Sequence, residues 1–572
     1  MSNSNEASVE MSCSKVIWTM LQEEGVDCVF GVSGMTNVAL LHALADMSGI
    51  KFVHAAHESV AMGMADGYSR ATGKLAVVVV HDTAGLSNTM GNLHNAYAAG
   101  SRVMVIVGQS DAPLEWSERY MDVDIRPMVS QTTKGCWMLT NANDVPLAVN
   151  RALKESRPPT GRPVVISVPS GIQAQVIPYR PMPAQGRHVA LDISPSPESI
   201  KSAAQLLAKA DNPIIFCSRI VADVNAMDEL VKLAETLAAP VHTGNESKLI
   251  FPTDHPLYRG LAFQTSGAMR SLAASADVLL MVGSDLLKYA DSLEEPIFSA
   301  ATKVIQIDLD AQALAGYCST ELALLANPKH ALSALDEAVS GQVPQEKHSA
   351  RMERLTREHQ QRKTFVDECL NEDFEAVPIR WGAAFREIAA AIPADSVVVD
   401  ELASFYGQLS KVLELSNPGS YFNTCESLGW GLPATLGVAL ANPQKPVISL
   451  VGDGAALFAI QALWTAAQYQ IPAVMVIFNN SGYGCMREMF TQYGQAVAPA
   501  MDAADCANYD ISGLNYSNLA SEFGVEGRRV TDPNQIKSVM QEMIALKKPA
   551  VVELMVCPYG SGMNEMRAAF FQ

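Results

Sequence analysis

The 572-residue sequence has neither a long hydrophobic run nor an excess of positive charge. Its longest apolar stretches, such as residues 471–478, have the length of a strand and fall short of the ~18–20 residues that span a bilayer. With 41 basic and 60 acidic residues, the formal net charge is −19. A surface that neutralises phosphates is therefore not expected, and neither nucleic acid nor a membrane is predicted as a partner.

The sequence also contains no paired-cysteine motif, and its first residues do not indicate secretion. Its ten cysteines are scattered without a C-x-x-C pair, which argues against a zinc site and against a disulfide framework. Residues 1–15 are polar, carry Glu6 and Glu10, and show no basic region followed by an apolar one. These features predict a protein of the reducing cytoplasm.

Apolar runs alternate with helical patterns along the chain. Hydrophobic residues make up 48% of the sequence and charged residues 18%, which is typical of a chain with a large core. The runs VFGV, LAVVVV, VMVIVG and PVVISV lack the period-2 alternation of half-buried strands, and this indicates parallel sheets covered by helices on both faces. We predict an α/β protein of three doubly wound parallel-sheet domains.

Two polar segments divide this alternation. Residues 176–187 contain three prolines and no periodicity, which favours a linker on the surface. Residues 341–352 form a second polar boundary. The predicted domains are listed in chain order: residues 1–185, 190–345 and 353–572.

The most informative segment covers residues 447–484. A buried strand ends there at GDG (452–454), a helix is expected over about 457–469, and a second buried strand ends at NN (479–480). The crossover between parallel strands is right-handed, so the carboxyl ends of both strands open on the same edge of the sheet. Ligands of open α/β sheets bind at that edge.

The residues at this edge suit a metal and a diphosphate. Asp453, Asn480 and the backbone carbonyl of Gly482 supply hard oxygen ligands for Mg²⁺, and Ca²⁺ could substitute. Gly452 and Gly454 allow a phosphate to approach the backbone at the start of the following helix. A bare GDG is more often a tight turn, but GDG followed by NN at two strand ends predicts a metal-bridged diphosphate.

This pair of motifs resembles the diphosphate-binding motif of the thiamine diphosphate-dependent enzymes, and the resemblance extends over nearly the whole chain. It implies a pyrimidine-binding domain, a central domain and a diphosphate- and Mg²⁺-binding domain, in that order. The family also requires a glutamate in its first domain, and Glu58 precedes the family-like run ADGYSRATG at a predicted helix start. The bland alternative is that Glu58 stabilises the helix N-terminus electrostatically.

The resemblance implies that Glu58 hydrogen-bonds the pyrimidine ring of the cofactor and promotes removal of the thiazolium C2 proton. Because Glu58 and the GDG motif lie on different domains, the resemblance also implies a site closed between two chains. The predicted assembly is a homodimer at least, and commonly a homotetramer.

Three further residues match family positions around the cofactor. Leu428 in CESLGWGLPA corresponds to the apolar residue that wedges the cofactor into a bent conformation, although an ordinary core leucine is the alternative. Ser404 in DELASFYG falls where hydroxyls lie near the diphosphate, but its neighbours Leu402 and Ala403 carry no hydroxyl. Tyr483 is placed with the cofactor-binding residues.

Within the family, the chain most resembles the benzoylformate decarboxylase branch, through HDTAGLSNTMGNLHNAYAAGSRVMVIVGQ, NPGSYF and ALWTAAQYQIPAVMVIFNN. That branch has a proton-relaying histidine at the position of His81, and histidine titrates near neutrality. Met486 stands where pyruvate and indolepyruvate decarboxylases carry a catalytic glutamate and the benzoylformate branch is apolar. His54, His57 and His94 lack such support and are interpreted as structural.

Two positions depart from that branch. Met35 stands where benzoylformate enzymes use a serine to hold the substrate carboxylate, and Ala290 beside Tyr289 stands where they use a second histidine. The substrate is therefore not carried over from the resemblance. Four residues are placed in the substrate pocket: Ser33, Met35, Thr36 and Met486.

The leading hypothesis is a carboxy-lyase that decarboxylates a 2-oxo acid with an apolar or aromatic side chain, without oxidation, through a C2 ylid and an enamine that His81 helps to protonate. The alternative is a carboligase of acetolactate-synthase type that forms a 2-hydroxyketone, which the two departures favour. A non-catalytic cofactor-binding subunit is disfavoured by Glu58. GVSGMTN and VGDGAAL both fail the G-x-G-x-x-G pattern of a nicotinamide dehydrogenase, and no motif indicates FAD.

Overall fold

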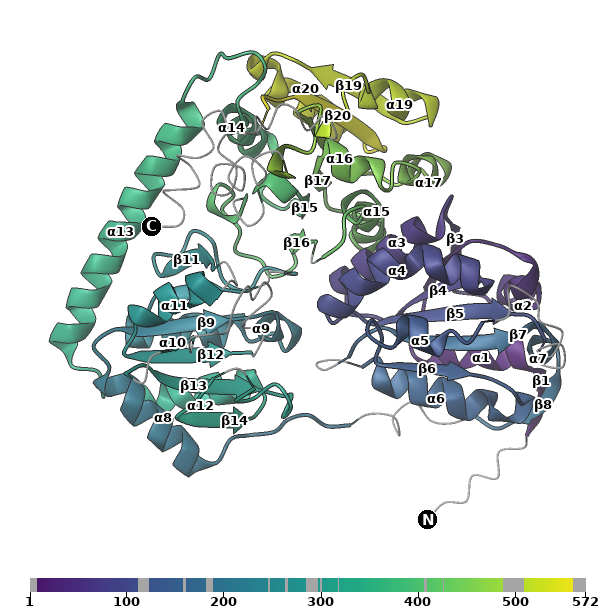
Figure 1. Ribbon diagram of the computed structural model, residues 1–572, viewed down its shortest axis with the longest axis horizontal. Helices are drawn as coiled ribbons and strands as arrows, with labels where there is room; N and C mark the ends of the chain where they lie inside the picture. The colour runs from purple at the N-terminus through teal and green to yellow at the C-terminus, as the bar shows by residue number, and fades with distance from the viewer. Residues whose placement is uncertain are drawn as a thin grey trace, which may run out of the picture.

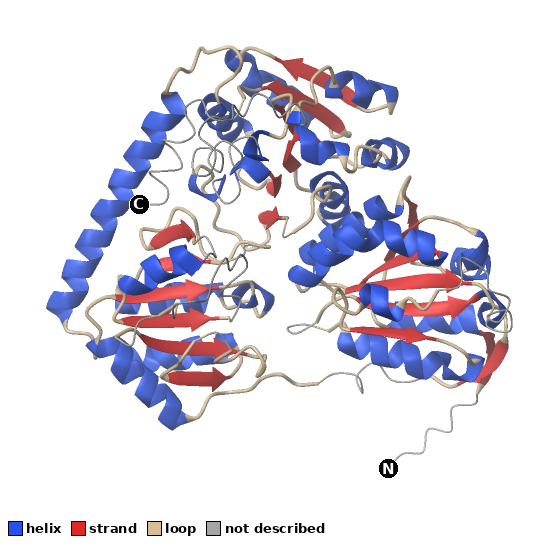
Figure 2. Cartoon of the chain, in the orientation of Figure 1, coloured by secondary structure: helices blue, strands red, loops and turns tan. Residues whose placement is uncertain are grey.

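The computed structural model describes residues 8–111, 123–157, 161–181, 189–244, 247–262, 266–283, 297–298, 301–316, 318–405, 409–424, 426–486 and 509–558. Within these residues the chain forms three six-stranded parallel sheets, each flanked by helices (Figures 1 and 2). The predicted fold class, three doubly wound parallel-sheet domains, is confirmed. No described helix combines the length and the apolar character needed to cross a bilayer.

The N-terminal sheet has the strand order β3-β2-β4-β5-β7-β6. The four apolar runs singled out in the sequence lie in its central strands, and their β-branched side chains are buried on both faces. The strands are β2 (Cys28–Gly31), β3 (Lys51–His54), β4 (Ala76–His81), β5 (Val103–Gln109), β6 (Gly135–Met138) and β7 (Val164–Pro169). The helices are α1 (Cys13–Glu23), the 3₁₀ helix η1 (Met35–Asn37), α2 (Val38–Ala45), α3 (Glu58–Thr72), α4 (Asp82–Ala98), α5 (Arg126–Val129), α6 (Val145–Glu155) and α7 (Ser170–Gln173).

The central sheet has the order β11-β10-β9-β12-β13-β14. Its strands are β9 (Pro213–Cys217), β10 (Val241–Thr243), β11 (Tyr258–Leu261), β12 (Val278–Val282), β13 (Lys303–Asp308) and β14 (Leu322–Leu325). Its helices are α8 (Pro197–Lys209), α9 (Ile220–Asp223), α10 (Met227–Leu237), α11 (Ser266–Ala274) and α12 (Pro328–Val339). The long helix α13 (Gln345–Asn371) then leads to the last sheet, as Figure 1 shows.

The C-terminal sheet has the order β16-β15-β17-β18-β20-β19. Its strands are β15 (Val397–Glu401), β16 (Tyr421–Asn423), β17 (Val447–Gly452), β18 (Val474–Asn479), β19 (Glu526–Val530) and β20 (Ala550–Met555). Its helices are α14 (Trp381–Ala391), the 3₁₀ helices η5 (Ala403–Phe405) and η6 (Leu409–Lys411), α15 (Gly431–Ala441), α16 (Asp453–Leu457), α17 (Ala462–Tyr469), α19 (Tyr516–Glu522) and α20 (Pro533–Ala545).

The first and third sheets share one topology. Numbered within each sheet, both have the strand order 2-1-3-4-6-5, whereas the central sheet has the order 3-2-1-4-5-6. In the two outer sheets the chain reverses its direction of winding between the first and third strands, which are β2 and β4 in one and β15 and β17 in the other. Ligand crevices of open α/β sheets lie at the carboxyl ends of such a strand pair.

Two local predictions are wrong. The helix expected over 457–469 is two helices, α16 and α17, because the turns between them form i−3 hydrogen bonds such as Phe458 N–H to Ala455 O at 3.2 Å. The expected linker begins with a strand, β8 (Val176–Tyr179), which pairs antiparallel with β1 (Val9–Ser12). Its prolines concealed a period-2 pattern, and an edge strand tolerates proline. The second polar boundary also becomes helical where α13 begins.

The first and third sheets are joined by the packing of α3 on α15, which lie side by side in Figure 1. The two backbones touch, since a Cβ atom at Gly67 would overlap Ala434 of the other helix. A fully buried ion pair between Asp66 and Arg70 lies beside this contact, and the Trp430 indole N–H donates to Asp66 at 2.7 Å. Two of the predicted site helices are therefore fixed relative to each other by interior contacts.

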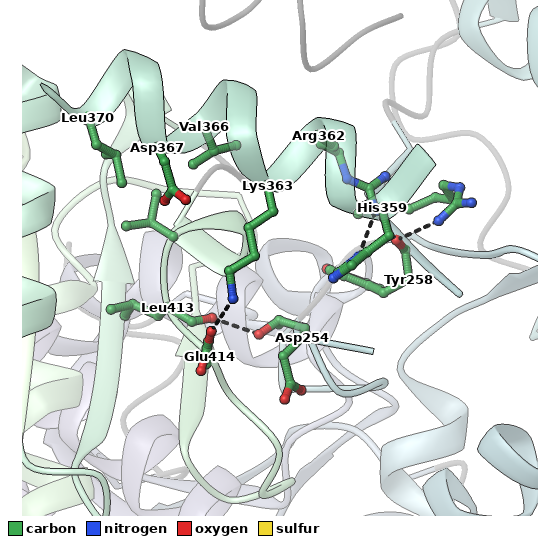
Figure 3. Close-up of a pocket in the computed structure, with 14 residues that line it drawn as sticks. Asp254, Tyr258, His359, Arg362, Lys363, Val366, Asp367, Leu370, Leu413 and Glu414 are labelled. Carbon is green, nitrogen blue, oxygen red and sulfur yellow. Dashed lines mark hydrogen bonds and ion pairs between the residues drawn. The ribbon is translucent and has the colours of Figure 1, made fainter. Parts of the chain in front are cut away.

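A separate cavity of about 140 Å³ lies between α13, the β11 edge and the segment Val412–Glu414 (Figure 3). Charged side chains of both signs line it, and Lys363 pairs with Glu414 at 2.7 Å on its rim. None of the residues predicted to bind cofactor, metal or substrate is among its lining residues.

Candidate active site

Asp453 and Asn480 come together at the edge of the third sheet. Asp453 begins α16 after β17, and Asn480 follows β18. The backbone N–H of Gly482 lies 3.2 Å from Asp453 Oδ2 and 3.2 Å from Asn480 Oδ1, and Gly454 N–H donates to Asp453 Oδ1 at 2.8 Å. The two predicted metal ligands thus converge although they lie far apart in sequence.

Above about pH 6, Asp453 carries the negative charge that a bound cation requires. Burial raises the pKa of this carboxyl from 3.8 to about 6, against backbone N–H groups that lower it. No lysine or arginine of the described ranges forms an ion pair with it. A carboxylate, an amide oxygen and a carbonyl form a donor set that Mg²⁺ accepts, with water and phosphate completing the octahedron. The described residues contain no cluster of three or more His, Cys, Asp or Glu, as expected for a site with one carboxylate.

Of the two glycines that flank Asp453, Gly452 faces open space and Gly454 does not. A Cβ atom at Gly452 would meet nothing within 4 Å, so open space faces the backbone at the end of β17. A Cβ atom at Gly454 would lie 2.5 Å from the Tyr483 ring, so this glycine is required by the tyrosine packed on it. Ser404 lies in η5 directly after β15, across the same strand pair. The open space, the hydroxyl and the helix start together fit a diphosphate.

The turn that carries Leu428 is held by hydrogen bonds to α4 on one side and to Glu401 on the other. From α4 of the first domain, Asn95 Oδ1 accepts the N–H groups of Glu426 and Ser427, each at 2.8 Å. From the same helix, Asn92 donates to the Gly429 carbonyl at 3.2 Å. Leu428 itself is half-buried and packs against the core shared by the two domains.

Glu401 holds the other side of this turn, and sequence analysis missed it. Its carboxyl oxygens accept Trp430 N–H at 2.8 Å and Gly431 N–H at 2.9 Å, at the start of α15. The side chain is fully buried, which raises the pKa of the carboxyl from 4.5 to about 8. The sequence signal that could have identified Glu401 is the acidic residue at the end of the run VVVDE.

Glu58 begins α3, as predicted, and is half-buried. Its Oε2 accepts the side-chain N–H of Asn88 on α4 at 2.9 Å. Gly85 of the same helix lies so near that a Cβ atom there would be 3.2 Å from Glu58 Oε1. One carboxylate oxygen is therefore held by the neighbouring helix, through Asn88, which sequence analysis did not single out.

His81 ends β4 at the strand pair where the first sheet reverses its winding. Its Nδ1 lies 2.7 Å from Thr36 Oγ1, and Thr36 Oγ1 donates to the Gly108 carbonyl at 2.7 Å. A Cβ atom at Gly34 would overlap the imidazole, so the ring lies flat against the glycine backbone. The next residue, Asp82, is fully buried at a φ of 52°, a conformation that costs about 1–3 kcal/mol in a non-glycine residue and concentrates at functional sites.

The residues placed in the substrate pocket lie in different environments. Met35 is 80% exposed, Ser33 is exposed, and Met486 is 39% exposed. Thr36 is 7% exposed, and its hydroxyl is engaged by His81 and Gly108. Tyr289 and Ala290 lie outside the described residues.

The remaining histidines of the first domain have structural partners or lie at the surface. His57 caps α3 by accepting Ser59 N–H at 3.1 Å, and the His54 ring packs edge-on against Trp464. His94 is exposed. Their interpretation as structural residues fits these positions.

The chain thus carries two polar sheet edges. Within the described ranges, no hydrogen bond or ion pair joins Glu58 or His81 to Asp453 or Asn480. The first edge holds a carboxylate and an imidazole, which are groups able to exchange protons, and the third holds a carboxylate and an amide, which are groups able to ligate a cation. Together they supply what a diphosphate cofactor with acid–base chemistry requires.

Known proteins with the same organisation were found in sequence and in structure. A benzoylformate decarboxylase of Pseudomonas aeruginosa is 29% identical over 542 residues, which cover 94% of this chain and 97% of the relative. A probable acetolactate synthase large subunit of Methanocaldococcus jannaschii is 25% identical, over 96% of this chain and 92% of the relative. The solved thiamine diphosphate-dependent 4-hydroxybenzoylformate decarboxylase of Rhodococcus jostii superposes with a TM-score of 0.81 at 27% identity, over 96% of this chain and 99% of that one.

Three domain models of one enzyme family match the chain in order. The thiamine pyrophosphate enzyme N-terminal TPP binding domain matches residues 11–125, the central domain matches 200–335, and the C-terminal TPP binding domain matches 403–554. These matches fall on all three sheets, although β6, β7 and β15 lie outside them, and they include Glu58, His81, Asp453 and Asn480. The chain belongs to the thiamine pyrophosphate enzymes, and thiamine diphosphate is the cofactor that its outer domains are built to bind.

Proposed function

We propose that this enzyme decarboxylates a 2-oxo acid with an apolar or aromatic side chain, without oxidation, as a carboxy-lyase that depends on thiamine diphosphate and Mg²⁺. The observation that carries the proposal is the pairing of Glu58 and His81 on one sheet edge with Asp453 and Asn480 on the other. The similarity to decarboxylases of benzoylformate and 4-hydroxybenzoylformate supports the substrate class.

The third sheet edge would hold the cofactor. Asp453, Asn480 and the Gly482 carbonyl would ligate Mg²⁺, and the open backbone at Gly452 and the start of α16 would receive the diphosphate. Ser404, Gly454 and Tyr483 complete this edge, and Leu428 would shape the cofactor. When bound, the cofactor supplies a carbon nucleophile and an electron sink.

The first sheet edge would move protons. Glu58 would hold a proton toward the pyrimidine ring with one oxygen, while Asn88 fixes the other. His81 would deliver a proton to the substrate carbon after CO₂ leaves, through the ring nitrogen that Thr36 does not touch. The 80% exposed Met35 and the exposed Ser33 and Met486 would line the substrate side chain and carboxylate.

A homodimer is the minimal active assembly in this proposal, and a homotetramer is the assembly expected from the family. Large apolar side chains stand exposed near both edges, Met35 beside His81 and the 55% exposed Phe458 after α16. A second chain would cover such surface and bring the complementary edge to each site.

The second candidate is a carboligase that joins the decarboxylated substrate to another carbonyl compound. It is supported by the similarity to a probable acetolactate synthase and by Met35, which offers no hydroxyl to hold a substrate carboxylate. A slow proton delivery would leave time for the second carbonyl to react.

Product analysis tests both candidates. The cofactor-free enzyme is incubated with thiamine diphosphate, Mg²⁺ and a panel of aliphatic and aromatic 2-oxo acids, and aldehydes, CO₂ and hydroxyketones are measured. We expect aldehyde and CO₂ from aromatic or apolar members, and none without Mg²⁺. Hydroxyketone as the main product would select the carboligase, and no CO₂ from any member would refute decarboxylation.

A further inference from the structure

His81 has one ring nitrogen engaged by the protein and one left for chemistry. Its Nδ1 faces Thr36 Oγ1 at 2.7 Å, while no described residue forms a hydrogen bond to its Nε2. Gly34 packs against the ring, and any side chain at this position would overlap the imidazole. The two nitrogens therefore have different surroundings.

The hydroxyl of Thr36 has a single proton and two short contacts. One is to the Gly108 carbonyl at 2.7 Å, and a carbonyl can only accept. If the hydroxyl gives its proton to this carbonyl, its oxygen is left to accept from His81, and Nδ1 must carry a hydrogen. The Thr36 backbone N–H also points at Nδ1, but at 3.5 Å it is at the limit of hydrogen bonding.

Thr36 is itself held firmly. Its carbonyl accepts the side-chain N–H of the buried Gln173 at 2.6 Å, and Gln173 also donates to Val168 at 2.8 Å. The 3₁₀ turn around it is closed by Asn37, whose Oδ1 accepts Gly34 N–H at 2.9 Å. These contacts fix the backbone that carries the hydroxyl, so the hydroxyl offers Nδ1 a partner at a defined place in the fold.

We propose that Thr36 is a positioning residue that keeps neutral His81 in the tautomer with hydrogen on Nδ1, so that Nε2 is the nitrogen that exchanges the proton. This inference rests on the proposed role of His81 and assigns Thr36 a part different from direct substrate contact. In the Nδ1–H tautomer, Nε2 has a lone pair that takes a proton from solvent or substrate and returns it. The opposite tautomer would face the site with an N–H that cannot accept.

The tautomer can be read without any activity. In full-length enzyme with ¹⁵N-labelled histidine rings, the ¹⁵N signals of His81 distinguish a protonated from an unprotonated Nδ1, and the variant His81→Asn identifies them among the 11 histidines. At a pH where His81 is neutral, we expect hydrogen on Nδ1 in the wild type and in Thr36→Ser, and a mixture in Thr36→Val. Hydrogen on Nε2 in the wild type, or an unchanged signal in Thr36→Val, would overturn the proposal.

Turnover supplies the second readout. We expect Thr36→Val to lower kcat by about tenfold or more and to raise the share of hydroxyketone, while Thr36→Ser stays within about twofold of the wild type. The matched control is Thr133→Val, which removes another buried threonine hydroxyl of the same domain, bonded to the Val129 carbonyl at 2.8 Å. Equal losses of kcat in Thr133→Val and Thr36→Val would mean that Thr36 has a structural role only. A wild type inactive on every 2-oxo acid would refute the proposed function, whereas the ring signals decide this inference separately.

Discussion

The first and third sheets have the same strand order, yet they hold their functional side chains in different ways. On the third sheet, Asp453 is held by backbone N–H groups of Gly454 and Gly482. On the first sheet, Glu58 and His81 are each held by one side chain, and each keeps one heteroatom to which no described residue forms a hydrogen bond. A side chain that ligates a bound cation needs to be held in one position. A side chain that exchanges protons needs one heteroatom held by the protein and another that is accessible to the proton donor or acceptor.

Removal of the Glu58 carboxylate, for which we propose a role in proton exchange, should give the largest effect on turnover. Glu58→Gln keeps the shape and the bond position to Asn88 but cannot exchange a proton in the same way. We expect kcat to fall by about 10²–10⁴-fold, with thiamine diphosphate affinity within a few fold of the wild type, measured by steady-state kinetics and calorimetry.

The control for this variant is Glu198→Gln, which neutralises an exposed glutamate in the first turn of α8. It removes a helix-terminus charge of the same kind without touching either edge. If Glu58→Gln is as active as this control, Glu58 serves only the helix N-terminus.

The affinity of the third sheet edge for Mg²⁺ should depend on pH in a defined direction. Because burial raises the pKa of Asp453 to about 6 in the metal-free chain, the carboxyl binds a proton as pH falls below that value, and Mg²⁺ must displace it. We expect the apparent dissociation constant for Mg²⁺, with thiamine diphosphate present, to rise about fivefold from pH 6 to pH 5 and to be flat from pH 7 to pH 8. Calorimetry in two buffers would show proton release on binding at pH 5.

Two neighbouring carboxyls titrate near the same range and need a control. Burial raises the pKa of Asp400 to about 6 and that of Glu401 to about 8. The variants Asp400→Asn and Glu401→Gln each remove one of these titrations while leaving Asp453 in place. An unchanged acid dependence in both variants excludes Asp400 and Glu401 as its source, and a dependence that disappears in either variant would contradict the role of Asp453.

The division of labour between the edges predicts complementation between two inactive variants. If each site combines Glu58 of one chain with Asp453 of the other, a mixed dimer of Glu58→Gln and Asp453→Ala has one site with both wild-type residues. Random reassembly of equal amounts should then restore about a quarter of wild-type activity per site. The mixture is unfolded, refolded and assayed beside each variant alone, and no gain on mixing would mean that both residues of a site come from one chain.

Much of this architecture could be predicted from the sequence. The strands β4, β5, β7 and β18 are continuous apolar runs, and two such runs joined by a helix leave little freedom but a parallel pair, so Asp453 and Asn480 had to converge. The helix start at Glu58 was also visible.

The hydrogen bonds that hold the site residues in place could not be predicted from the sequence. Thr36, Asn95 and Glu401 act through contacts with residues tens to hundreds of positions away, and no local pattern encodes such pairs. The strand β8 was missed because Pro178 and the two prolines that follow the strand hid the alternation of Ile177 and Tyr179, which pairing with β1 explains.

The turn around Leu428 would couple the proposed cofactor binding to the docking of the first domain on the third. Its N–H groups and carbonyls are divided between Glu401 beneath it and the asparagines of α4 beside it, so the turn keeps its shape only while the first domain is docked on the third. The central domain contributes none of these contacts. If Leu428 shapes the cofactor as proposed, the cofactor should be lost on gradual denaturation together with the α3–α15 contact, because the turn loses its hydrogen bonds to α4 when the two domains separate.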